Sequence, residues 1–333
     1  MKNSSVQPNP LTDPIIPAIR STALVVAVST GLFATIAERR MGVGQLAKAL
    51  GLSPQGVGRL AEVLVVGGYL SRVDDEYELS EVSRMAFLKG GSFELTNWVK
   101  FCRVQLRAVG CLETALMEGR PIDLFGLMTS ETELLTHQRA MAETAKPAAD
   151  WVASNIPVPP GAKNMLDVGG SHGVYSAAIC RRNPPLQSQV LELSSVLEMA
   201  RAVSEEYSTD RYVSHIEGDI TTTTLAKTYN VVFLGNILHH LPDKSPTGVL
   251  TKIAANMVPG GTIAIWDLAE TDEEPDETAA CFSLFFHLTS GAKCYSESEI
   301  KTLLRSCGFG HIQVTRPPQV STHILYTAQK LKE

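Results

Sequence analysis

The sequence predicts an α/β protein of two domains, in which a mainly helical domain precedes a larger domain built on a mostly parallel sheet. Three observations lead to this prediction. The 333 residues are enough for about two domains at roughly 100 to 200 residues each. Up to about residue 92 the pattern indicates helices and one small hairpin, whereas after a proline-rich linker at 157–161 strands alternate with helices. Such alternation is typical of βαβ units and a parallel sheet.

The chain begins with a polar segment and an apolar helix. Residues 1–12 are polar and rich in proline and asparagine, and we expect a flexible arm there. The domain at 13–92 has an apolar run at 22–37. This run is too short to span a membrane, and no basic cluster precedes it as in a cleaved leader. We therefore expect a core helix, a cytoplasmic location and no membrane partner.

A winged-helix-like pattern follows this helix. Helices are predicted at 43–50 and 55–66, and the segment YLSRVDDEYELS after them has the pattern of a short hairpin. Winged helices often bind DNA, but residues 46–80 contain three basic side chains against five acidic ones. The whole chain has 29 Lys and Arg against 35 Asp and Glu. Because binding to nucleic acid requires neutralisation of phosphates, we expect a dimerisation module and no nucleic-acid partner.

Residues 93–156 are predicted to form a helical connecting layer that also contributes to a substrate pocket. The layer carries Trp98, Met128, His137 and Met141 at positions where they can face such a pocket. Aromatic and methionine side chains at helical spacing are also typical of core packing, so a purely structural role is the alternative.

The domain at 157–333 carries the strand and helix alternation. Ligands of such sheets bind outside the carboxyl ends of the strands, so functional residues are expected directly after each strand. The predicted strands are NMLDVGG, SQVLEL, HIEGDI, YNVVFLGNIL and GTIAIWDL, and the helices between them are VYSAAICRRN, SSVLEMARAVSEEY and residues 245–257.

The first of these strands ends in a glycine-rich turn. Asp167 precedes Gly169, Gly170 and Gly173, and glycines at such a turn let the backbone approach a ligand closely. The turn lacks the G-x-G-x-x-G spacing that seats a pyrophosphate on a helix N-terminus. The carboxylate of Asp167 would repel a phosphate, so a cationic cofactor without phosphate fits this turn better.

Acidic residues also end the next two strands. Glu192 follows the glycines by about 20 residues, where a carboxylate can accept hydrogen bonds from both ribose hydroxyls. Asp219 follows the third strand, where it can bind an adenine amino group. Three carboxylates at one edge suit S-adenosylmethionine, whose sulfonium and ammonium groups are positive. The expected cofactor contacts are Asp167, Gly169, Gly170, Gly173, Glu192, Leu193, Gly218, Asp219, Ile220, Gly235 and Asn236.

These segments resemble successive motifs of a known family. LDVGGSHGVYS, VLEL, EGDI, VVFLGNILHHLPD and MVPGGTIAIWDL are similar to motifs of class I S-adenosylmethionine-dependent methyltransferases. The front half is similar to the dimerisation domain of the plant-type and bacterial small-molecule O-methyltransferases. The resemblance implies a Rossmann-like, mostly parallel seven-stranded sheet, a homodimer formed through the N-terminal domain, and methyl transfer to a small, aromatic secondary metabolite.

The fourth strand leads into a doubled histidine. A histidine at this edge can take a proton from a substrate hydroxyl while the oxygen attacks a methyl group, and imidazole has an ordinary pKa of about 6.5 that suits this work. The resemblance implies that His239 is the general base and that His240 fills a position where the family has Asp. The alternative is a doubled histidine in which neither ring acts as a base.

The family orients its base with two acids, and this sequence departs from that pattern. The first acid matches Asp267, where the family usually has glutamate, and the second matches Cys294. A thiol does not replace a carboxylate unless its pKa is lowered. Glu299 is near, but the spacing from Ser296 to Glu299 predicts a helix capping box that occupies it. A base held by one acid suits an already acidic phenol or enol, or transfer to nitrogen or carbon by proximity.

The apolar run before this loop predicts an aromatic-lined acceptor pocket. Its expected members are Trp98, Met128, His137, Met141, His240, Leu284, Phe285, His287 and Cys294.

Other functions were weighed against methyl transfer. They are a winged-helix DNA-binding regulator, a protein that binds the cofactor for a reaction other than methylation, and a nicotinamide-dependent dehydrogenase, which the glycine spacing disfavours. No metal is expected, because no ligand cluster of suitable spacing is present.

Overall fold

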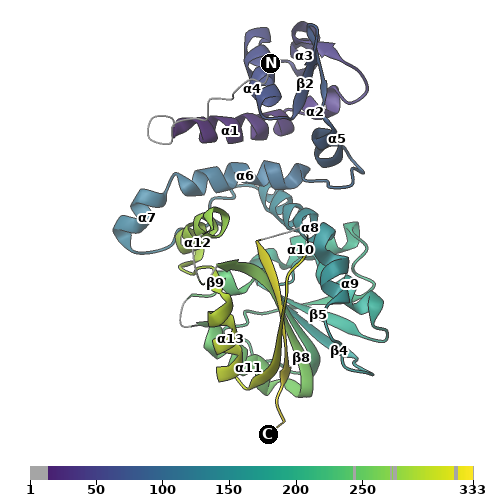
Figure 1. Ribbon diagram of the computed structural model, residues 1–333, viewed down its shortest axis with the longest axis vertical. Coiled ribbons are helices and arrows are strands. Elements are labelled where there is room, and N and C mark those ends of the chain that lie inside the picture. Colours follow the sequence, from purple (N-terminus) through teal and green to yellow (C-terminus); the bar gives the residue numbers. More distant parts are fainter. Residues whose placement is uncertain (1–13, 243–244, 271, 273–275, 319–321, 333) are drawn as a thin grey trace. The chain divides into compact units, whose positions relative to one another are not determined.

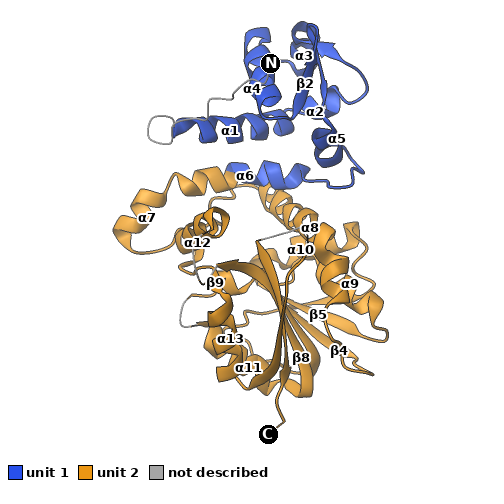
Figure 2. Cartoon of the chain, viewed as in Figure 1, with its two compact units in different colours: residues 1–103 blue, residues 104–333 orange. Residues whose placement is uncertain are grey.

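The structure, a computed structural model, describes residues 14–242, 245–270, 272, 276–318 and 322–332. The chain divides into two compact units, Met1–Arg103 and Val104–Glu333 (Figure 2). The division falls inside helix α6, Thr96–Val109, whereas the domain limits predicted after residues 92 and 156 follow linker composition. The flexible arm predicted at 1–12 lies outside the described residues.

The first unit combines helices with a three-stranded antiparallel sheet of order β1-β3-β2. Asp74 turns the chain between β2 and β3 with a φ of +54°, a left-handed conformation that aspartate tolerates better than most residues. The hairpin predicted from the sequence is therefore confirmed. The elements of this unit are α1 Ile15–Ser29, α2 Leu32–Thr35, β1 Met41–Gly42, α3 Val43–Leu50, α4 Pro54–Val66, β2 Leu70–Val73, β3 Glu76–Leu79 and α5 Glu81–Phe87.

The apolar run at 22–37 forms two helices of this unit. Gly31, with a φ of +76°, separates α1 from α2, a conformation that glycine adopts without steric cost. Beyond the break, Leu32 and Phe33 are buried, and the ring of Phe33 lies 4.6 Å from that of Phe87. The run is core, as predicted, but its helix is interrupted.

The second unit is built on the mostly parallel sheet that the sequence predicts. Seven strands follow the order β10-β11-β8-β7-β4-β5-β6, and the two-residue strand β9 pairs with β8 as an eighth. Strands β8, β7, β4, β5 and β6 are mutually parallel, whereas β11 and β10 are antiparallel to their neighbours. The strands are β4 Asn164–Val168, β5 Gln187–Glu192, β6 Val213–Glu217, β7 Tyr229–Gly235, β8 Met257–Glu270, β9 Tyr295–Ser296, β10 Phe309–Thr315 and β11 His323–Lys330.

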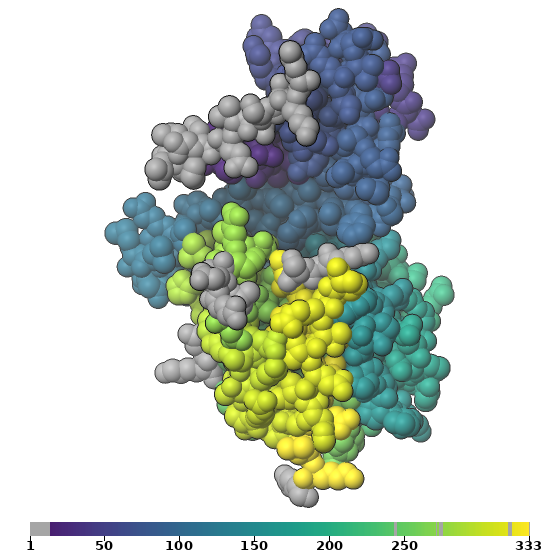
Figure 3. All heavy atoms as spheres, in the orientation of Figure 1, coloured from purple at the N-terminus to yellow at the C-terminus, as the bar shows by residue number. Residues whose placement is uncertain are grey.

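Helices cover both faces of this sheet (Figure 1). In β7, Val232 and Leu234 pack into one apolar cluster, whereas Val231 and Phe233 pack into the other, because successive side chains of a strand point to opposite faces. The last strands, in yellow, form much of the near surface of this unit (Figure 3). The helices are α7 Leu112–Glu118, α8 Glu131–Ser154, α9 Val174–Arg182, α10 Ser194–Glu206, α11 Ser245–Ala255, α12 Glu277–Ser290 and α13 Glu297–Ser306, with a 3₁₀ turn, η1, at Leu238–His240.

Burial on both faces explains why β4 and β7 are almost continuously apolar. The parallel direction of β4, β5, β6, β7 and β8 brings their carboxyl ends to one edge of the sheet. The residues predicted to bind cofactor lie at or directly after the first four of these ends, and Asp267 lies near the carboxyl end of the fifth.

Candidate active site

Three positions of the glycine-rich turn after β4 are unsuited to a side chain. A Cβ on Gly170 would lie 2.2 Å from the carboxyl carbon of Asp167, and one on Gly169 would lie 2.6 Å from Cδ1 of Ile237. Gly169 and Gly173 also have left-handed φ values of +63° and +67°. The turn therefore requires glycine at these positions.

Asp167 is a buried carboxyl with one unsatisfied oxygen. Its side chain is 1% exposed, and Oδ2 accepts a hydrogen bond from Ser176 Oγ. Among the described residues, Oδ1 has no hydrogen-bond partner. Burial raises the pKa of Asp167 to about 7, and the nearby charge of Glu192 adds to this rise against the hydrogen bond from Ser176. An unsatisfied buried carboxyl oxygen fits the positive groups of S-adenosylmethionine.

We expect Asp167 to make stability depend on pH. A carboxyl whose pKa rises from 3.8 to about 7 on folding holds a proton that the unfolded chain has lost, so stability falls as the pH rises through that window. Asp167→Asn removes this titration. Without cofactor, the free energy of unfolding of the variant, measured by urea titration, should rise relative to wild type between about pH 4 and about pH 8. A difference that stays constant with pH would contradict the assignment.

Glu192 is held at the end of β5 by two backbone groups. The N–H of Ser171 donates to Oε2 at 3.1 Å, and the N–H of Leu193 donates to Oε1 at 2.9 Å. Burial raises the pKa of Glu192, and these two hydrogen bonds oppose the rise. Each oxygen keeps lone-pair capacity for a further donor, as a ribose-binding carboxylate requires. Leu193 itself is 42% exposed beside it.

Asp219 follows β6 in a tight turn. The backbone N–H and the hydroxyl of Thr221 both donate to Oδ1, at 2.8 and 2.7 Å. A Cβ on the preceding Gly218 would lie 2.6 Å from Thr223 Oγ1, and the following Ile220 is buried. The turn therefore fixes the carboxylate through one oxygen. No described residue donates a hydrogen bond to the other.

The two residues predicted as catalytic meet at the same edge. His239 lies in η1 and Asp267 lies in β8, and the imidazole Nδ1 is hydrogen-bonded to Asp267 Oδ1. The N–H groups of Leu238 and Leu268 also donate to this carboxylate, at 3.1 and 2.8 Å. His239 and Asp267 are 4% and 3% exposed. The His239 ring stacks on Phe286 with 3.8 Å between ring centres. The pair is therefore fixed in position.

Cys294 does not supply a second acid. The side chain is buried, and burial together with the charges of Asp267 and Glu270 raises the pKa of its thiol to about 12. The group is a neutral thiol near pH 7. Glu299 is engaged as predicted, because its Oε2 accepts from Ser296 N at 2.9 Å in a capping box. The structure thus places one carboxylate on His239.

The predicted acceptor residues lie in several places. A hollow of about 440 Å³ contains Leu284 and His287 among its lining residues. The side chain of His240 is exposed to solvent, but many protein atoms surround its ring. The partial loss of water around the ring, together with the nearby His239 and His137, holds the pKa of His240 well below its usual range. Burial lowers the pKa of His137 to about 4, and its ring meets Phe125 edge-on at 5.7 Å.

Four other predicted pocket residues are not among those that line the hollow of about 440 Å³. Met128 is 6% exposed, and Met141 is partly buried on α8. Phe285 packs against a small apolar cluster that includes Leu288. Trp98 belongs to the first unit, and its role in a pocket stays a prediction.

Asn236 and Gly235 end β7. Asn236 has a left-handed φ of +56°, and its Oδ1 lies 3.0 Å from His323 Nε2. The His323 ring stacks on Trp266 at 5.0 Å. Sequence reasoning missed His323, because only the antiparallel register of β11 on β8, with Ile324 opposite Asp267, brings it here.

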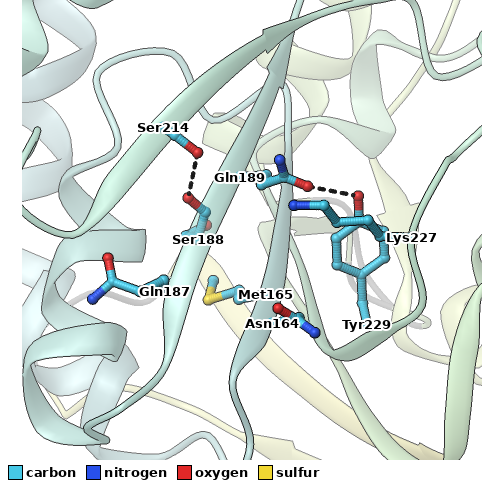
Figure 4. Close-up of a pocket in the computed structure, with 8 residues that line it drawn as sticks. All are labelled: Asn164, Met165, Gln187, Ser188, Gln189, Ser214, Lys227 and Tyr229. Carbon is cyan, nitrogen blue, oxygen red and sulfur yellow. Dashed lines mark hydrogen bonds between the residues drawn. The ribbon is translucent and has the colours of Figure 1, made fainter.

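A second hollow of about 110 Å³ lies at the opposite edge of the sheet (Figure 4). Its walls come from the amino-terminal parts of β4, β5, β6 and β7, and Tyr229 Oη donates to Gln189 Oε1 there at 3.2 Å. This hollow is separate from the carboxyl-end site. Elsewhere, the part of the chain that the structure describes contains no group of three His, Cys, Asp or Glu side chains placed to hold a metal ion.

The mostly parallel sheet with this strand order is the fold of class I methyltransferases. The O-methyltransferase domain family matches residues 93–310, and the chain belongs to that family. Its activity is O-methyl transfer, and its cofactor is S-adenosylmethionine.

The similarity to known proteins covers nearly the whole chain. It is 24% identical over 318 residues to a tetracenomycin polyketide synthesis 8-O-methyltransferase of Streptomyces glaucescens, covering 89% of each chain. It is also 24% identical over 331 residues to a 3-hydroxy-5-methyl-1-naphthoate 3-O-methyltransferase of Streptomyces sahachiroi, covering 93% of this chain and 91% of that one. The human N-acetylserotonin methyltransferase, crystallised with S-adenosylmethionine, has the same fold, with a TM-score of 0.87 at 22% identity over 100% of both chains.

Within the described residues, none of the helices combines the length and the apolar character that crossing a membrane requires.

Proposed function

We propose that this O-methyltransferase of secondary metabolism methylates a hydroxyl group of a small aromatic acceptor, with His239 as the general base. The observation that carries the proposal is the buried contact between His239 Nδ1 and Asp267, at the sheet edge that also carries the three carboxylates. Family membership supports the reaction, and this geometry supports the choice of base.

The residues at the strand ends fit the cofactor. Glu192 would hold the ribose and Asp219 the adenine amino group, while the glycine turn lets the backbone approach. The unsatisfied Oδ1 of Asp167 would face positive charge. When bound, S-adenosylmethionine supplies an electrophilic methyl group on a sulfonium. Gly235 and Asn236 would close this site from the end of β7.

His239 would remove the proton from the acceptor. Because Nδ1 is bonded to Asp267, the imidazole keeps its proton on that nitrogen, and Nε2 remains to accept one from a hydroxyl. Asp267 then stabilises the imidazolium. Its own carboxylate is held by two backbone N–H groups, so the orientation of the ring is fixed before the acceptor binds.

A single orienting acid favours an acidic acceptor. The neutral thiol of Cys294 adds no negative charge beside the base. Phenols lose their proton more readily than alkyl alcohols do, so a base oriented by one carboxylate suits them. The naphthoate methyltransferase among the similar proteins acts on a hydroxylated aromatic, which agrees with this choice.

Mass spectrometry tests the proposal. The protein is incubated with S-adenosylmethionine and a panel of hydroxynaphthoates and other phenols. We expect the acceptor to gain one methylene unit at oxygen while S-adenosylhomocysteine accumulates. A methyl group found on nitrogen or carbon, or a changed acceptor with unconsumed cofactor, would contradict the proposal.

We further propose that the first unit forms a homodimer. Helix α1 leaves Ile15 and Ile19 62% and 52% exposed, and Val66 at the end of α4 is 80% exposed. Ile15 and Ile19 lie one turn apart on the same face of α1, and a contiguous exposed apolar face is typical of a protein–protein contact. Light scattering of the whole chain should give twice the 36.0 kDa mass of one chain, and a monomer would contradict the proposal. The cytoplasmic location stays a prediction.

A further inference from the structure

Ser171 stands in the middle of the glycine-rich turn in a conformation that suits glycine. Its φ is +47°, in the left-handed region. A non-glycine residue persists there only where its surroundings hold it. The neighbouring positions 169, 170 and 173 of the turn are all glycine. The bonds that hold Ser171 therefore identify what keeps this turn in shape.

Three elements hold Ser171 in place. Its hydroxyl donates to Gln138 Oε1 on α8. Its carbonyl oxygen accepts from His215 Nε2 on β6 at 2.7 Å. Its N–H donates to Glu192 Oε2 at the end of β5 at 3.1 Å. The same residue thus links α8 to the carboxylate proposed to bind the ribose.

Gln138 uses both ends of its side-chain amide. The side chain is 3% exposed. Its Oε1 accepts from Ser171, and its Nε2 donates to His137 Nδ1 at 3.2 Å. Because an amide nitrogen only donates, Nδ1 of His137 is the acceptor and the ring proton lies on Nε2. His137 is one of the residues predicted to face the acceptor, and burial keeps its ring neutral by lowering its pKa to about 4.

We propose that Gln138 is a positioning residue that ties the cofactor carboxylate to the acceptor side of the site. Through Ser171 it keeps the N–H group on Glu192, and through its own N–H it sets which nitrogen of His137 carries the proton. A continuous chain of hydrogen bonds then runs from Glu192 through Ser171 and Gln138 to His137. This inference rests on the proposed cofactor site and adds a residue that touches neither cofactor nor reacting atoms.

This chain of hydrogen bonds predicts how substitutions affect the affinity for the cofactor. Gln138→Leu and Ser171→Gly each remove the same side-chain hydrogen bond, and Ser171→Gly does so while keeping a residue that accepts the left-handed conformation. Each should weaken S-adenosylhomocysteine binding by roughly threefold to tenfold, as expected for loss of one buried hydrogen bond. The double variant should bind no more weakly than the weaker single variant, because the bond between the two side chains is already absent in each single variant.

Gln138→Glu is the matched control. Glutamate keeps an oxygen that accepts from Ser171 but has no N–H for His137. We expect it to retain wild-type affinity for S-adenosylhomocysteine, a rescue that mere loss of packing on α8 would not produce. If Gln138→Leu melts at a lower temperature than wild type, its weaker binding can come from lost packing. The comparison of Gln138→Glu with Ser171→Gly then shows whether the hydrogen bond itself supports cofactor binding.

Isothermal titration calorimetry measures the affinity for S-adenosylhomocysteine of wild type, the two single variants, the double variant and Gln138→Glu. The melting temperature of each protein is measured alongside. The proposal holds if the single losses are not additive and Gln138→Glu binds like wild type. Additive losses in the double variant, or wild-type affinity in Ser171→Gly, overturn it. Failure of wild type to bind at all would instead contradict the proposed function, so the two failures are distinguishable.

Discussion

His239→Ala is expected to lower kcat by roughly 10²- to 10⁴-fold, the usual contribution of a positioned general base. The reason lies in the buried pair. Asp267 holds Nδ1 of His239, and two backbone N–H groups hold Asp267, so the variant loses a base that is already oriented. Initial rates with an acceptor found by mass spectrometry give the measurement.

The affinity for S-adenosylhomocysteine should stay near wild type in His239→Ala, because the ring is assigned to the proton and not to the cofactor. Asp219→Ala is the matched contrast. It should weaken S-adenosylhomocysteine binding, since its carboxylate is assigned to the adenine amino group. An unchanged turnover in His239→Ala would remove the histidine from the mechanism.

Asp267→Asn is expected to lower kcat by roughly 10²- to 10⁴-fold, close to the loss for His239→Ala. An asparagine amide can donate to Nδ1, which would leave the ring proton on Nε2, where it blocks acceptance of the substrate proton. The variant also lacks the negative charge that stabilises the imidazolium. The pH dependence of kcat, compared with wild type, measures this loss.

Asp267→Glu is the control for that variant, because it keeps the carboxylate and is the residue that the family usually has. It should retain far more activity than Asp267→Asn. If the two variants are equally impaired, the side chain acts through packing at this buried position and not through its charge on His239.

The strand ends were accessible to sequence reasoning because a parallel sheet brings them to one edge. Asp167, Glu192 and Asp219 were predicted from their positions after three successive strands, and the structure places them at the carboxyl ends of β4, β5 and β6. Strand β6 begins at Val213, earlier than the predicted segment HIEGDI, but its end still delivers Gly218 and Asp219 to the site. Burial of β7 on both faces produces a short continuous apolar run, which predicted this strand from the sequence.

Contacts between distant segments could not be predicted in the same way. The hydrogen bond from Ser171 to Gln138 depends on the rotation of α8 over the sheet, and that from His323 to Asn236 depends on the register of β11. Nothing in local periodicity encodes either. The neutrality of the Cys294 thiol likewise follows from burial beside Asp267 and Glu270, which only the fold defines.

A crystal structure with S-adenosylhomocysteine and a bound acceptor would test the role of His239 most directly. The account predicts that the acceptor oxygen lies about 2.6 to 3.2 Å from His239 Nε2, within reach of a hydrogen bond. An acceptor oxygen beyond the reach of that nitrogen, with another side chain in its place, would contradict it.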